Sequence, residues 1–125
     1  MIFDTDVLIW FLRGSPKAAR AVDSEENRSI SLVTYMELLQ RSKNKHETHE
    51  IKGFLKDFGF STLPLTENIG HRASIYVEEY ALSHSIGVAG ALVAATAVEG
   101  NQVLLSANIK HFKCVKELQL KQFRP

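Results

Sequence analysis

The spacing of apolar positions changes repeatedly along the chain and divides it into short strands and amphipathic helices. Residues 1–4 form a short apolar run that ends in an aspartate, and residues 5–12 stay densely apolar until a glycine follows. This pattern predicts a strand followed directly by a helix. The pair Ser15-Pro16 then has the composition of an N-cap and a first helical residue, which predicts a second helix over residues 17–26.

The same alternation continues to the end of the chain. Further strands are predicted at residues 29–32, 61–65, 102–106 and 118–123. Further helices are predicted at residues 34–42, 50–58, 66–83 and 89–98, with a polar connection at 43–49 and a helical turn at 108–113. Short apolar strands that alternate with helices are typical of βαβ units, so we expect an α/β fold with a parallel sheet covered on both faces.

Length and composition indicate one globular domain that spans residues 1–125. The chain is 45% apolar and 23% charged, with 15 Lys and Arg against 14 Asp and Glu. A net charge of +1 excludes the overall basic character of many nonspecific nucleic-acid binders, so a polyanion must be bound locally. The single cysteine, Cys114, favours a reducing cytoplasm, and we see neither a membrane span nor a signal peptide.

Candidate chemistry begins at the end of the first predicted strand. Ligands of parallel sheets bind outside the carboxyl ends of the strands, which makes Asp4 the first candidate. A structural role is also open, because Asp4 can cap the helix that follows and Asp6 suits its first turn. Asp4 and Asp6 together are similar to the opening of haloacid dehalogenase-like phosphatases. Those enzymes need further acids after a later strand, and residues 103–108 contain none, so this phosphatase remains a remote alternative.

Glu37 is the second candidate, and it also has two interpretations. It follows Thr34 by three residues, the spacing of a capping box in which the glutamate bonds to the backbone of the N-cap. Alternatively, Glu37 projects from its helix towards Asp4. Two carboxylates held that close repel each other, and a divalent cation between them removes the repulsion.

Four blocks of the sequence, taken in order, resemble a PIN domain of the VapC toxin type. They are IFDTDVLIWFLRG at 2–14, SLVTYMELL at 31–39, ALVAATA at 91–97 and LLSANIKHF at 104–112. The resemblance implies a three-layer α/β/α fold with a short parallel β-sheet. It also implies a metal-dependent endoribonuclease toxin that uses Mg²⁺ or Mn²⁺, cleaves RNA, forms homodimers and is silenced by a cognate antitoxin protein.

By position, the resemblance assigns the metal ligands. Asp4 matches the first acid of the family, Glu37 the second and Asn108 the fourth, which varies between acid and amide; Asp6 is an auxiliary ligand. An N-cap is the structural alternative for Asn108. The third acid is replaced here by Gly90.

Because magnesium sites use only a few carboxylates, we expect the replacement at Gly90 to weaken or abolish cleavage. The alternative is a catalytically inactive PIN domain that binds antitoxin or RNA. A glycine inside a helix costs about 1 kcal/mol relative to alanine, and nothing in the surrounding run of small residues requires it. Both a natural loss and a detoxifying substitution therefore remain open.

The basic residues give weaker indications. We expect Arg13 and Lys110 to contact RNA phosphates, although a solvated basic surface would explain them equally well. The five histidines are scattered along the sequence, and we expect them at the surface. The apolar residues 7–12, together with Leu38 and Leu39, are expected to serve both the core and an antitoxin groove.

Overall fold

The computed structural model describes all of residues 1–125 and contains five strands and seven helices. In chain order these are β1 (Ile2–Phe3), α1 (Thr5–Leu12), α2 (Pro16–Asp23), β2 (Ser29–Ser31), α3 (Leu32–Gln40), α4 (Lys45–Asp57), β3 (Ser61–Leu63), α5 (Glu67–His84), α6 (Val88–Glu99), β4 (Leu104–Ser106), α7 (Ile109–Phe112) and β5 (Leu120–Gln122). None of the helices combines the length and the apolar character that crossing a membrane requires.

All five strands are parallel and lie in the order β3-β2-β1-β4-β5. The sheet therefore grows in one direction from β1 to β3 and in the other direction through β4 and β5. Strand order reverses between β1 and β4, and in such sheets the crevice at the reversal is where ligands bind. The backbone N–H of Asp4 donates to the carbonyl of Leu105 at 2.9 Å, which joins these two strands where β1 ends.

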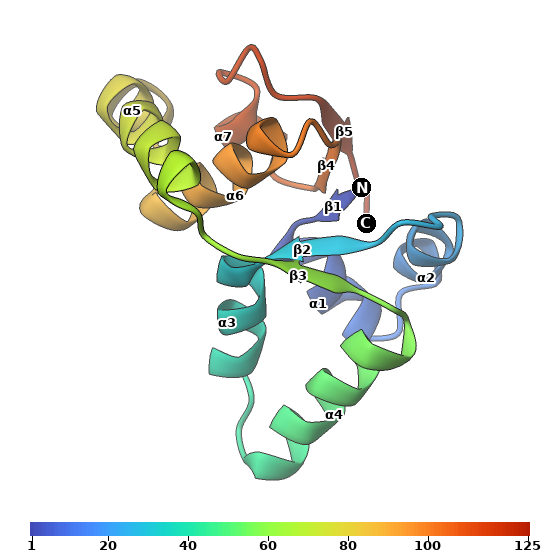
Figure 1. Ribbon diagram of the computed structural model, residues 1–125. Helices are drawn as coiled ribbons and strands as arrows, with labels where there is room; N and C mark the ends of the chain where they lie inside the picture. The colour runs from blue at the N-terminus through green and yellow to red at the C-terminus, as the bar shows by residue number, and fades with distance from the viewer.

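Helices cover both faces of the sheet (Figure 1). One apolar cluster lies under α5, α6 and α7, and the other lies under α1, α2 and α4. Consecutive residues of a strand point to opposite faces, so Ile2 belongs to the first cluster and Phe3 to the second. Helix α3 contributes to both, with Val33 in the first and Leu38 in the second. The predicted three-layer α/β/α fold is confirmed.

Two helix starts differ from the prediction. Helix α4 begins at Lys45, inside the expected polar connection, because Asn44 caps it and its Oδ1 accepts the Glu47 N–H at 2.9 Å. Helix α3 begins at Leu32 with Ser31 as its N-cap. The predicted capping box is therefore wrong, since Thr34 lies inside the helix and is fully buried. Met36, also in α3, is half-exposed.

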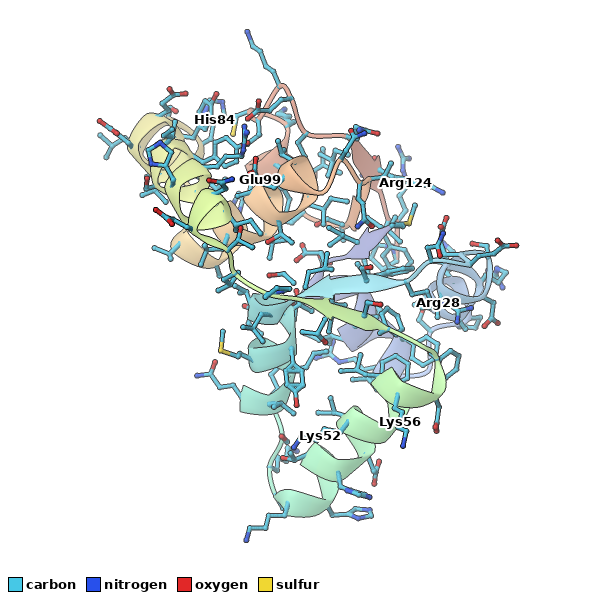
Figure 2. The ribbon with its side chains drawn as sticks, in the orientation of Figure 1. Arg28, Lys52, Lys56, His84, Glu99 and Arg124 are labelled. Atoms are coloured by element: carbon cyan, nitrogen blue, oxygen red, sulfur yellow. The ribbon has the colours of Figure 1, made fainter.

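A polar network holds α5 to α6, the two helices whose connection lines the site. Arg72 of α5 donates to Glu99 at 2.8 Å and to Glu117 at 2.8 Å, and the Tyr76 hydroxyl also donates to Glu117. Figure 2 shows Glu99 at the end of α6, on the side that faces α5. Both carboxylates share one guanidinium, so the network links α5, α6 and the segment before β5.

Candidate active site

Asp4 joins the carboxyl ends of the two central strands. It follows β1 directly and caps α1, as predicted, because its Oδ1 accepts the Thr5 N–H at 2.9 Å. Its Oδ2 accepts the hydroxyl proton of Ser106, the last residue of β4, at 2.7 Å. The two carboxylate oxygens are therefore held in place, one by the start of α1 and the other by the end of β4.

Asp6 lies in the first turn of α1, and only one of its two carboxylate oxygens has a hydrogen-bond partner. Its Oδ2 accepts the Ala107 N–H at 3.1 Å, whereas its Oδ1 is buried without any hydrogen-bond partner. A buried carboxylate oxygen without a partner is unfavourable in a folded protein. Binding of a cation would satisfy it.

Glu37 is held towards α1 rather than towards the start of its own helix. Its Oε1 accepts from the Thr5 hydroxyl at 2.7 Å, and the Thr5 oxygen lies 3.0 Å from the Thr34 hydroxyl oxygen. A hydroxyl carries one proton and a carboxylate only accepts, so the Thr5 proton is the one shared with Glu37. Thr5 thereby holds two acids, Asp4 through its backbone and Glu37 through its side chain.

The two neighbouring acids disfavour the charged form of Asp4. Burial, followed by the charge of Asp6 and more weakly that of Glu37, raises the pKa of Asp4 from 3.8 to about 6. Hydrogen bonds from Ser106 and Thr5 oppose this rise in part. Burial also raises the pKa of Asp6. Such carboxylates favour a proton or a cation at this position.

These acids line a hollow of about 580 Å³ together with Gly90 and Asn108. Gly90 is the third residue of α6. A Cβ atom placed there would lie 3.7 Å from Ile86 Cγ1 and 3.8 Å from the Phe112 ring, which are ordinary contacts. The backbone at this position therefore does not require glycine, and the hollow has room for a side chain.

Asn108 occupies the N-cap position of α7, as predicted, but its side chain makes no capping bond. Its backbone N–H donates to Ser106 Oγ at 2.9 Å. Its side-chain amide nitrogen lies 2.9 Å from Nδ1 of His111. Asn108 is thus tied to the Asp4 partner Ser106 through its backbone and to a histidine through its side chain.

The basic residues in the hollow are not the ones chosen from the sequence. Arg13 lies at the opposite end of α1 from Asp4, where it packs over Trp10 and lines a second hollow. Lys110 is exposed and lines neither hollow. Arg41 and His111 line the acidic hollow instead. The four-residue spacing from Glu37 to Arg41, which places both on one face of a helix, was the available signal for Arg41.

The donor set fits a divalent cation, although incompletely. No group of three His, Cys, Asp or Glu side chains is arranged to hold a metal ion by itself. The donors are nevertheless hard carboxylate oxygens, the type that Mg²⁺ and Mn²⁺ bind, and one of them, Asp6 Oδ1, is buried without a partner. A cation could therefore be held by two or three acids with water completing its shell.

Comparisons with known proteins agree with this architecture. The PIN domain family matches residues 1–118. The chain is 32% identical over 123 residues to ribonuclease VapC10 of Mycobacterium tuberculosis, covering 95% of this chain and 90% of that protein. Its fold resembles a toxin–antitoxin complex from Klebsiella pneumoniae, with a TM-score of 0.79, 24% identity and coverage of 94% and 93% of the two chains. It also resembles VapBC2 from Rickettsia felis bound to a DNA fragment from their promoter, with a TM-score of 0.80, 21% identity and coverage of 99% and 100%.

Proposed function

The chain belongs to the PIN domain family, and from this premise we propose that it is a metal-dependent endoribonuclease toxin weakened by the glycine at its third acidic position. The 32% identity to a ribonuclease supports RNA as the substrate. The observation that carries the proposal is the position of Gly90, which lines the same hollow as Asp4 and Glu37 and leaves room for a carboxylate.

Asp4 and Glu37 would hold Mg²⁺ or Mn²⁺, with Asp6 as an auxiliary ligand. A bound divalent ion supplies a water of lowered pKa and neutralises charge on a phosphodiester. The residues around the acids fix their positions: Ser106 and the Thr5 backbone hold Asp4, and the Thr5 hydroxyl holds Glu37. With Gly90 in place the site has one carboxylate fewer than the resemblance implies, so cation affinity and cleavage are weak.

We also propose that the partner is an antitoxin protein and that the chain works as a homodimer. Both structural neighbours named above were solved as toxin–antitoxin assemblies, which supports the first point. The second hollow supports an antitoxin groove, because Ile9, Phe11 and Leu12 line it with Leu38. Val7 and Leu8 are fully buried and do not contribute to such a groove.

A second candidate function is antitoxin or RNA binding without cleavage. The observation that favours it is the lack of three metal-binding side chains in one cluster. The two functions differ in what Gly90→Asp does: a nuclease gains activity, whereas a binding module gains none.

The test is cleavage of single-stranded RNA in Mn²⁺ by the parent chain, Gly90→Asp, and Gly90→Asp combined with Asp4→Asn. We expect Gly90→Asp to cut at least about tenfold faster than the parent, because an added ligand tightens cation binding. We expect Asp4→Asn to remove that activity. If no variant cuts RNA while all remain folded, the nuclease proposal is wrong. If the parent and Gly90→Asp cut equally fast, position 90 is not the third acidic position.

A further inference from the structure

Two side chains of the acidic hollow, Arg41 and His111, have no part in the proposed cation site. We propose that they bind the phosphate backbone of single-stranded RNA at the mouth of the hollow, each donating to a phosphate oxygen. This inference deepens the proposed function and rests on it, since it concerns the substrate of the same site.

Arg41 presents a guanidinium that nothing else in the chain uses. It follows α3 as its C-cap and is exposed, and its side chain makes no hydrogen bond or ion pair within the chain. Arg28 differs, because its guanidinium donates to two backbone carbonyls. Arg41 lines both the acidic hollow and the second hollow, so it lies between them. Its planar set of N–H donors suits a phosphate group.

His111 presents a donor whose position is fixed by a neighbour. The Asn108 amide nitrogen lies 2.9 Å from Nδ1 of His111, and an amide nitrogen can only donate, so Nδ1 accepts. The neutral imidazole then carries its proton on Nε2. No group of the chain accepts from Nε2, and His111 is partly buried and lines the hollow. An N–H donor is therefore free for a ligand.

The two donors come from elements on opposite sides of the sheet. Figure 1 shows α3 on one side of the sheet and α7 on the other. Arg41, which follows α3, and His111 of α7 both line the hollow. Asp4, Asp6 and Glu37 line the same hollow. A phosphodiester bound next to these carboxylates needs hydrogen-bond donors as well as a cation. An RNA strand that crosses from one helix to the other would meet both.

The experiment measures binding of a short, labelled single-stranded RNA to the full chain with Gly90 in place, by fluorescence anisotropy in Mg²⁺ at several salt concentrations. We expect Arg41→Gln and His111→Phe each to weaken binding about tenfold. Arg41→Gln also lowers the slope of log affinity against log salt by about 0.7, the value for one lost phosphate contact on a single strand. His111→Gln keeps an amide N–H and retains most of the affinity.

Arg20→Gln is the matched control, because it removes the same guanidinium charge at an exposed residue of α2 that lines neither hollow. We expect it to leave the affinity and the salt slope nearly unchanged. An equal loss in Arg20→Gln and Arg41→Gln would show that binding depends on general charge, and the proposal would be wrong. Equal losses in His111→Gln and His111→Phe would overturn the role of the N–H donor. Thermal melting of each variant checks that it is folded.

Failure of this inference is distinguishable from failure of the proposed function. If Gly90→Asp cleaves RNA but Arg41→Gln and His111→Phe bind it like the parent, only the assignment of the two donors is wrong. If the binding results agree with expectation but Gly90→Asp cleaves nothing, RNA binding at the hollow stands and the nuclease proposal fails.

Discussion

Asp4 combines a structural and a chemical role in one side chain. As an N-cap it accepts the Thr5 N–H, and as the link between β1 and β4 it accepts the Ser106 hydroxyl. Its pKa of about 6 nevertheless shows that its charge is unfavourable in the folded chain. A rise of this size corresponds to about 3 kcal/mol between the two protonation states. The folded chain therefore favours a positive species beside Asp4 at neutral pH.

Asp4→Asn should change stability in a pH-dependent manner. The pKa of Asp4 is higher in the folded chain, at about 6, than the ordinary value of 3.8. Its protonation therefore stabilises the fold fully below about pH 4, and this contribution is lost as the pH rises through 6. Without divalent ions, we expect Asp4→Asn to be more stable than the parent at pH 7 by up to about 3 kcal/mol, with a gain that vanishes towards pH 4.

Urea unfolding at several pH values measures this difference. Asp57→Asn, at the exposed last residue of α4, is the control and should show no such trend. A stability difference between Asp4→Asn and the parent that stays constant from pH 4 to pH 7 would contradict the environment described for Asp4.

The role of a single residue could be predicted from the sequence where that residue acts through its neighbours in the chain. The cap at Asp4 follows from the adjoining strand and helix and was predicted correctly. Of the two interpretations of Glu37, the capping box was wrong, because Ser31 and Thr34 can both cap a helix and only tertiary packing decides between them. His111 carried no local signal, since its place in the hollow depends on contacts far along the chain.

At the scale of elements, α1 and α3 are connected through the hydroxyl of Thr5. This hydroxyl touches Thr34 and Glu37, and Thr5 and Thr34 are both buried. We expect Thr5→Val, which keeps the shape and removes the hydroxyl, to destabilise the chain by about 1–3 kcal/mol because Glu37 loses its donor. Equilibrium unfolding in urea gives the value. Thr62→Val at an exposed position of β3 is the control, and equal stability of Thr5→Val and the parent would contradict the connection.

Element boundaries were predictable where apolar spacing marked them. Helix α1 was predicted with the bounds that the structure shows, because its apolar residues run without a break from Val7 to Leu12. Helix α4 was predicted to begin five residues late, since its first turns are polar and exposed. The pair Asn44 and Glu47 was the signal for its start: Asn44 accepts the Glu47 N–H, and Glu47 accepts the Lys43 N–H at 3.3 Å.

At the scale of the whole molecule, the strand order creates the site. Alternating strands and helices predicted a parallel sheet between helices, which is confirmed. The order β3-β2-β1-β4-β5 was not predictable from that alternation, because it depends on which strand pairs with β1. Since β1 and β4 are neighbours, residues about a hundred positions apart, Asp4 and Ser106, meet at one point. For this reason the sequence predicted each acid as a candidate by itself but did not predict the hollow that they share.

The most direct test of an incomplete cation site is the Mn²⁺ affinity of the parent chain, of Gly90→Asp, and of Gly90→Asp combined with Asp4→Asn, measured by calorimetry. We predict that Gly90→Asp binds Mn²⁺ at least about tenfold more tightly than the parent, because it adds a carboxylate to the hollow. We predict that the added Asp4→Asn change reverses this gain. Equal Mn²⁺ affinity in the parent and Gly90→Asp would contradict the assignment of Gly90 to the site.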